Sequence, residues 1–121
     1  MQGLRTVIYP VQDLEAASRW YAAVFQTTPY YAEPFYVGFQ IGGFELGLVP
    51  DGRPSADGQV VYWGCEQLEQ QVERLHREFG ARIIAPVTDV GDGIRVATIA
   101  DPDGNALGLI DNPHFNPANI R

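Results

Sequence analysis

The sequence has a single cysteine, few basic residues and no long apolar run. Cys65 is the only cysteine among 121 residues, which excludes an intramolecular disulfide and any metal cluster built from several cysteines. It lies in the apolar run 60–65, so we expect a small buried hydrophobic side chain there and not a nucleophile. The chemistry of this protein therefore does not centre on thiols.

Apolar segments of membrane length are also missing. No run approaches the roughly 20 residues that span a bilayer, and the N-terminus lacks the apolar segment of a signal peptide. The sequence therefore predicts a cytoplasmic protein with no membrane partner.

Basic residues are outnumbered by acidic ones, eight to 15, which gives a net charge of -7. A negative surface disfavours nucleic acid and mildly favours cationic ligands, although it also serves plain solubility. With 45% hydrophobic and only 19% charged residues, the chain is not expected to be disordered. Its length predicts one globular domain.

Hydrophobic periodicity predicts a strand, a helix and three strands in the first half. Residues 4–11 read as a strand, and Asp13 is the expected N-cap of a helix that ends near Phe25. Residues 30–40 are expected to form two short extended pieces, and Gly42 and Gly43 to turn the chain into a strand over 44–49.

The second half repeats this order after a linker at 50–58. Residues 11–15 resemble residues 65–69, 54 positions further on (65 minus 11), which indicates a duplicated unit. The expected elements are strands at 60–65, 81–87, 94–100 and 106–110, a helix at 68–79 stopped by Gly80, and turns at 89–93 and 101–105. Residues 112–121 read as a tail, which either stays free or packs on a partner.

Four segments together resemble the vicinal oxygen chelate superfamily, which includes lactoylglutathione lyases, bleomycin-resistance proteins and extradiol dioxygenases. They are residues 11–15, Trp20 with Tyr21, residues 44–47 and the Asp-Pro-Asp-Gly-Asn turn at 101–105. The resemblance implies an α+β fold of two βαβββ modules, about 4–49 and 59–111, whose curved mixed sheets surround a cleft. Gln26 departs from the family's usual glycine, and in a left-handed conformation it costs about 1 kcal/mol.

The resemblance also implies four positions for a divalent metal, one on each of four strands. In this chain they are Thr6, Glu45, Val60 and Gly108, and only Glu45 carries a good ligand. We therefore expect no metal cofactor. The two histidines do not replace the missing ligands: His76 reads as an exposed or half-buried helix residue, and His114 lies in the tail.

Glu45 is the candidate site residue. Period-two alternation directs Leu46 and Leu48 toward the helix and places Glu45 and Gly47 on the other face. Glycines beside the carboxylate, and Gly108 in the last strand, suggest a cavity. Either Glu45 points to water from a sheet edge, or it lies in the cavity and binds an amine or hydroxyl or acts as a general base.

Further side chains are expected to line the cleft. Tyr62 shares a face with Val60, and Arg95 either pairs with Glu45, binds an anionic ligand group or faces solvent. The aromatic side chains cap the pocket, pack a dimer interface or belong to the core; they are Tyr30, Tyr31, Phe35, Tyr36 and Phe39. Tyr36 is included among the expected ligand-binding residues.

Two functions follow from this reading. The first is a homodimeric protein that binds a small cationic or aromatic molecule in the cleft without a metal. The alternative is an enzyme similar to lactoylglutathione lyases or dioxygenases, which uses a relocated metal site or Glu45 as a general base.

Overall fold

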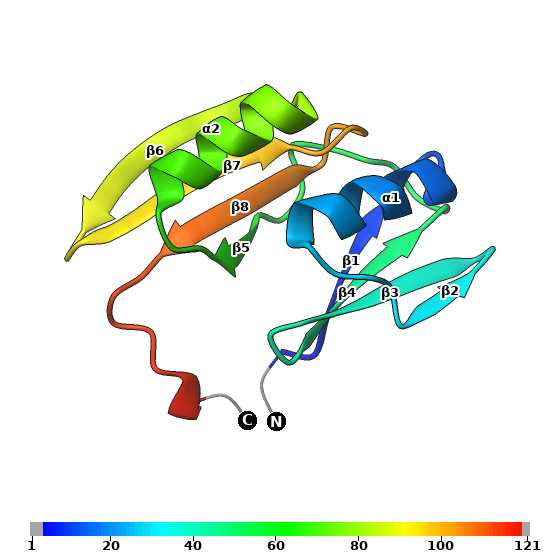
Figure 1. The fold of residues 1–121 in the computed structure, drawn as a ribbon, viewed down its shortest axis with the longest axis horizontal. Helices are drawn as coiled ribbons and strands as arrows, with labels where there is room; N and C mark the ends of the chain where they lie inside the picture. Colours follow the sequence, from blue (N-terminus) through cyan, green and yellow to red (C-terminus); the bar gives the residue numbers. More distant parts are fainter. Residues whose placement is uncertain (1–3, 120–121) are drawn as a thin grey trace. The chain divides into compact units, whose positions relative to one another are not determined.

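The computed structural model describes residues 4–119 and divides the chain into two compact units, Met1–Ser55 and Ala56–Arg121. The boundary falls within the segment 50–58 that the sequence predicts as a linker. Each unit has its own sheet, one helix and a core, and each is described by itself (Figure 1).

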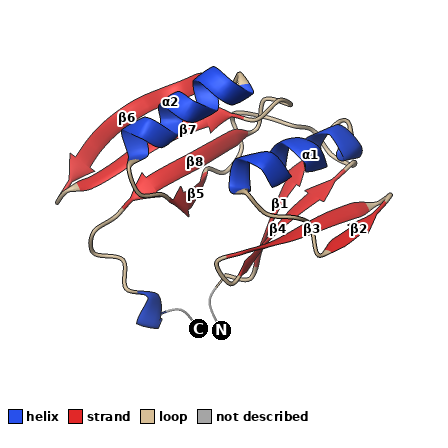
Figure 2. Ribbon diagram, viewed as in Figure 1, coloured by secondary structure: helices blue, strands red, loops and turns tan. Residues whose placement is uncertain are grey.

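The first unit has the order strand, helix, strand, strand, strand. Its elements are β1 (Thr6–Pro10), α1 (Leu14–Phe25), β2 (Tyr31–Glu33), β3 (Tyr36–Ile41) and β4 (Phe44–Val49). The strands form one sheet in the order β1-β4-β3-β2, in which β1 runs parallel to β4 and the other neighbours are antiparallel. Helix α1 covers one face of this sheet and contacts β3 and β4 (Figure 2).

The second unit repeats the arrangement. It contains β5 (Val61–Gly64), α2 (Leu68–Phe79), β6 (Ile83–Gly91), β7 (Ile94–Ala100), β8 (Ala106–Asp111) and a short 3-10 helix, η1 (Pro117–Asn119). The strand order β5-β8-β7-β6 again pairs the first strand with the last in parallel. The predicted α+β fold of two βαβββ modules is confirmed.

Helix α1 begins and ends as the sequence predicts. The Asp13 Oδ1 atom accepts a hydrogen bond from the Ala16 backbone N–H at 3.0 Å, which satisfies a donor that the first turn leaves unpaired. At the other end Gln26 adopts the left-handed conformation, with φ 54° and ψ 47°. A glutamine therefore stands where a side chain with a Cβ is strained.

The core of the first unit confirms the predicted alternation along β4. Leu46 and Leu48 are fully buried on the face that carries α1. Tyr21 of the helix is fully buried as well, and its ring stacks on Tyr9 and Phe25 at centroid distances of 5.8 and 6.1 Å. The face of the sheet that carries α1 is therefore buried in the core, and the opposite face does not contact the helix.

In the second unit, α2 ends at Gly80, which is left-handed with φ 64°, as predicted. The following hairpin differs from the prediction, because β6 continues to Gly91 and the turn is shorter than 89–93. Asp92 (φ 55°) and Gly93 (φ 77°) both have positive φ, the conformation that closes a two-residue hairpin. The short turn lets the preceding strand extend further.

The Asp-Pro-Asp-Gly-Asn turn joins β7 to β8 and is organised by Asp101, which is only 4% exposed. Its Oδ1 atom accepts hydrogen bonds from the backbone N–H groups of Asp103 (2.9 Å) and Asn105 (2.8 Å). Its Oδ2 atom accepts from the Asn105 side-chain amide at 2.9 Å. The turn is held by one buried carboxylate with several donors.

The structure also shows the surroundings of Cys65 and of the two histidines, His76 and His114. Cys65 is half-buried and not fully buried, and burial raises the pKa of its thiol. His76 is exposed on α2, as predicted, and its Nδ1 donates to the Ala81 carbonyl at 2.9 Å. In the tail, His114 Nε2 donates to the Asp92 carbonyl at 2.8 Å, so this part of the tail contacts the β6–β7 turn.

Among residues 4–119, no helix has the length and apolar character needed to cross a bilayer.

Candidate functional site

Glu45 lies on the face of the first unit's sheet that points away from α1. In the sheet register it stands opposite Thr6 of β1 on one side and Gln40 of β3 on the other. Because Leu46, the next residue, is buried on the helix side, the Glu45 side chain projects from the opposite face. The candidate site therefore rests on a central strand and not on a loop.

Two tyrosine hydroxyls donate hydrogen bonds to the Glu45 carboxylate, one to each oxygen. Tyr30 Oη donates to Oε1 and Tyr36 Oη donates to Oε2. Tyr30 immediately precedes β2 and Tyr36 begins β3, so the donors come from two neighbouring segments. We call Tyr30, Tyr36 and Glu45 the tyrosine-carboxylate cluster.

A pair of glycines makes room for the two rings. Gly38 and Gly47 lie opposite each other in the β3–β4 register. A Cβ atom at Gly47 would lie 2.7 Å from Tyr36 Cζ, and one at Gly38 would lie 3.2 Å from atoms of both tyrosine rings. The interpretation of Gly47 as open space is therefore wrong, because Tyr36 fills it.

The phenols remain protonated donors near neutral pH. Burial raises the pKa of Tyr36 well above its ordinary value of 10.0, and the hydrogen bond to Glu45 adds to this effect. The pKa of Tyr30 is raised as well, mainly by its hydrogen bond to Glu45 and to a smaller extent by burial. A phenolate beside a carboxylate is disfavoured by like charge, so both protons stay in place.

The aromatic residues of the segment 30–39 divide between the core and the exposed surface. Phe39 is fully buried, which confirms a core role for that residue, whereas Tyr30, Tyr31 and Phe35 are 57%, 40% and 62% exposed. Tyr31 lies 6.1 Å from the Tyr36 ring and 6.3 Å from the Phe35 ring. Aromatic surface thus continues from the cluster to the accessible end of the β2–β3 hairpin.

The predicted site residues fall into groups within each unit. Thr6, Tyr36 and Glu45 share the helix-free face of the first sheet. In the second unit, Tyr62 stands opposite Gly108 in the β5–β8 register, whereas Val60 precedes β5 and is exposed. A Cβ at Gly108 would lie 2.7 Å from Tyr62 Cδ1, so here too a tyrosine ring fills the space of the glycine.

Arg95 lies on the face of the second sheet that carries α2. It forms an ion pair with Glu69 of α2, and its Nη2 lies 3.4 Å from Asp111 Oδ2 of β8. Of the three alternatives for Arg95, none names these partners, because its guanidinium group pairs with two carboxylates of its own unit. The pKa of Glu69 is lowered, first by a hydrogen bond from its own backbone N–H and then by Arg95, and the two carboxylates raise the pKa of Arg95.

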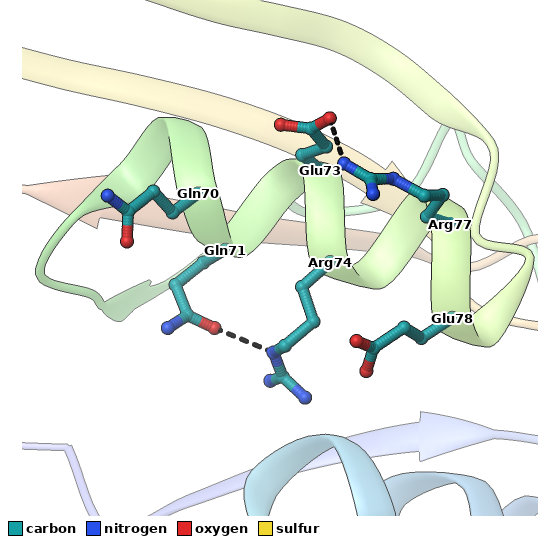
Figure 3. A pocket seen from close by; sticks show the side chains of 6 residues that line it. All are labelled: Gln70, Gln71, Glu73, Arg74, Arg77 and Glu78. Carbon is teal, nitrogen blue, oxygen red and sulfur yellow. Dashed lines mark hydrogen bonds and ion pairs between the residues drawn. The ribbon is translucent and has the colours of Figure 1, made fainter.

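Two pockets are lined by residues other than those of the cluster. One is formed over α2 by side chains of that helix alone: Gln70, Gln71, Glu73, Arg74, Arg77 and Glu78 (Figure 3). Within this pocket Glu73 pairs with Arg77, and Arg74 Nε donates to the Gln71 side chain at 3.1 Å. The other, of about 530 Å³, lies between α1 and the β2–β3 hairpin and is lined by residues that include Leu14, Ala32 and Val37.

The order βαβββ, repeated once with the first and last strands parallel in each unit, defines a class of proteins built from paired modules. The chain belongs to the Glyoxalase/Bleomycin resistance protein/Dioxygenase superfamily, whose family model matches residues 3–109. A comparison with curated protein sequences finds no match.

Solved structures show the same fold. A glyoxalase-related enzyme from Fulvimarina pelagi is 21% identical over 100% of this chain and 96% of its own, with a TM-score of 0.79. Lactoylglutathione lyase from Agrobacterium tumefaciens is 16% identical over 95% and 98%, with a TM-score of 0.74. TioX from Micromonospora sp. ML1 is 20% identical over 90% and 98%, with a TM-score of 0.68. At these identities the likeness establishes the fold alone.

The residues at the four metal positions do not fit a divalent ion. Glu45 is the only one of the four with a strong side-chain ligand group, Thr6 offers only a hydroxyl, and the side chains of Val60 and Gly108 have no ligand atom. Within residues 4–119, no three His, Cys, Asp or Glu side chains are grouped to hold a metal. We derive no chemical step through a metal at these positions.

The sequence analysis names Tyr30 only as a residue of the pocket, an interface or the core, and it missed both the hydrogen bond from Tyr30 to Glu45 and the two partners of Arg95. The signal for Tyr30 was present, because the segment 30–36 is unusually aromatic. Nothing in the local pattern identifies Glu69 or Asp111 as partners, since they lie 26 and 16 residues from Arg95.

Proposed function

We propose that this protein binds a small molecule on the helix-free face of the first unit's sheet, without a divalent metal at Glu45. The observation that supports this proposal is the tyrosine-carboxylate cluster, in which two hydroxyls fix one carboxylate on central strands. A fixed charge beside accessible aromatic rings is typical of a ligand site, because little freedom is lost on binding.

The proposal extends to residues of the second unit, to the oligomeric state and to the partners of the protein. We propose that Tyr62, Val60 and Gly108 belong to a ligand-binding surface of the second unit, that the protein is a cytoplasmic homodimer and that nucleic acid and membranes are not its partners. Arg95 is left out, because Glu69 and Asp111 occupy its guanidinium group.

The enzymatic alternative predicts turnover, either with a relocated metal or with Glu45 as a general base. Metal content of the protein purified without chelator separates the first form of this alternative from the proposal. One tightly bound divalent ion per subunit would contradict metal-independent binding.

A thermal-shift screen of small cationic, neutral and anionic aromatic compounds tests the proposal. A ligand at a hundred times its Kd stabilises the folded state by about 2.7 kcal/mol, so binders raise the Tm clearly. We expect amide NMR shifts from those binders to centre on β3 and β4 and to weaken in Glu45→Gln. The matched control is Glu78→Gln, which makes the same change on exposed α2. Binders whose shifts leave β3 and β4 unaffected would contradict the proposal.

A further inference from the structure

We propose that the group recognised at this site is an organic ammonium or guanidinium ion, and that Tyr30 and Tyr36 are the positioning residues that select it. This inference rests on the proposed function, since it concerns the ligand class of the same face. It follows from counting which hydrogen-bonding capacities the cluster has already used.

The hydroxyl protons of the cluster are already used in hydrogen bonds, whereas lone pairs of the Glu45 carboxylate remain available. A tyrosine hydroxyl has one proton to donate, and both Tyr30 and Tyr36 direct that proton to Glu45. Each carboxylate oxygen retains a lone pair, and the Tyr36 oxygen retains acceptor capacity, whereas the Tyr30 oxygen is already engaged by the Gln40 side chain. A ligand group that only donates therefore fits the cluster, whereas a carboxylate or phosphate meets the negative charge of Glu45 and two phenols whose protons are already donated to it.

The carboxylate is held in place through the glycine pair. The Tyr36 ring lies over Gly47, and both rings approach Gly38, so the two hydroxyls reach separate oxygens of Glu45. The Glu45 backbone is fixed as well, because its N–H donates to the Arg5 carbonyl at 2.9 Å. The geometry of the acceptors is thus set before a ligand arrives, which favours a charged donor over a flexible or neutral one.

Aromatic faces near the cluster complement the same ligand class. Tyr31 and Phe35 are exposed, and Tyr31 packs against Tyr36. A cation within about 6 Å of a ring centroid is attracted by the π electrons. A cation bound at Glu45 with an apolar body directed toward these rings satisfies both features.

Three probes of similar shape test the inference: benzylamine, which is an ammonium ion at neutral pH, benzyl alcohol and benzoate. Their Kd values are measured by amide NMR titration of the full chain. We expect benzylamine to bind at least about tenfold more tightly than benzyl alcohol, and benzoate to bind most weakly. Glu45→Gln removes the negative charge, so it should weaken the binding of benzylamine far more than that of benzyl alcohol and remove most of the preference between them.

The positioning role is tested with Tyr30→Phe, Tyr36→Phe and the control Tyr31→Phe. Each of the first two variants frees one carboxylate oxygen, so we expect a several-fold larger loss of affinity for benzylamine than for benzyl alcohol. In the same two variants the pKa of the remaining cluster tyrosine should stay raised above its ordinary value of 10.0, whereas a general loss of structure would return the pKa to that value. Tyr31→Phe keeps its ring and should keep the preference.

The outcomes separate this inference from the proposed function. Equal affinity for benzylamine and benzyl alcohol at β3 and β4 overturns the cation inference and leaves small-molecule binding intact. An unchanged benzylamine preference in both Tyr30→Phe and Tyr36→Phe overturns the positioning role. Absence of binding by every compound of the screen and all three probes overturns both proposals.

Discussion

The two units share one topology but place their charged side chains on opposite faces of the sheet. In the first unit, Glu45 projects from the face away from α1 and is met by two phenols. In the second, Arg95 lies on the helix side and joins Glu69 of α2 to Asp111 of β8. The repeat therefore conserves how the strands pair, while the chemistry of each face is set by single residues.

The glycines under the tyrosine rings differ in the same way. At Gly47 the atoms that a Cβ would meet all belong to the Tyr36 side chain, whereas at Gly108 they include the Val61 backbone carbonyl at 2.7 Å. A side chain can rotate away, but a paired strand cannot. The first glycine serves the cluster, and the second serves the packing of the sheet.

The largest expected effect comes from Asp101→Ala, which breaks the turn that the second unit has and the first lacks. Two backbone N–H groups and the Asn105 amide lose their acceptor in a buried site, so we expect a loss of about 3 kcal/mol in the free energy of unfolding. The measurement is urea denaturation. The control Asp51→Ala changes an exposed aspartate of the segment 50–58 and should alter stability by less than about 0.5 kcal/mol. Equal effects would contradict this account of the turn.

Gly108→Ala and Gly47→Ala sharpen the comparison of the two glycines. Overlap with backbone at Gly108 should cost about 2 kcal/mol, while Gly47→Ala should cost less than about 1 kcal/mol because Tyr36 can move. Urea denaturation gives both values. If Gly47→Ala proved the more costly of the two, the distinction between the glycines would be wrong.

The two helices end differently, and this difference can be removed. Helix α1 ends at left-handed Gln26 and α2 at left-handed Gly80. We expect Gln26→Gly to raise the free energy of unfolding by about 1 kcal/mol and Gly80→Ala to lower it by about the same amount. Thermal denaturation of both variants provides the check, and a destabilised Gln26→Gly would show that the glutamine side chain contributes more than its strain costs.

The smallest expected effect is a pH dependence confined to the second unit's ion pairs. The pKa of Glu69 is below its ordinary value of 4.5, so the folded state holds this proton less tightly than the unfolded state. The stability from this group is therefore present above about pH 4.5 and is lost as the pH falls through the lowered pKa. Urea midpoints measured on both sides of this range should fall less steeply in Glu69→Gln than in the unmodified protein, and parallel curves would contradict the assignment.

Most of the fold follows from local signals in the sequence. The cap at Asp13, the stop at Gly80 and the alternation along residues 44–49 depend on neighbouring residues alone, and the structure confirms them. The early end predicted for β6 was wrong, because the conformation of Asp92 and Gly93 decides how much chain the turn consumes.

The site was predicted less completely, because its contacts join distant residues. Alternation identified the face on which Glu45 lies, but not that Tyr30, 15 residues away, donates to it. From the sequence alone, a glycine in a strand is compatible both with an empty space beside the strand and with an aromatic ring that packs directly over the glycine. Only the arrangement of neighbouring strands decides between the two readings, as it does at Gly47.

The central claim, that Glu45 holds the protons of Tyr30 and Tyr36, is tested most directly by an alkaline absorbance titration of the tyrosines. The raised pKa of both groups means that their contribution to stability is complete below pH 10.0 and is lost as the pH rises through the raised values. We expect Glu45→Gln to shift part of the phenolate absorbance to lower pH, with Glu78→Gln unchanged. Identical titration curves for the unmodified protein and Glu45→Gln would contradict the account.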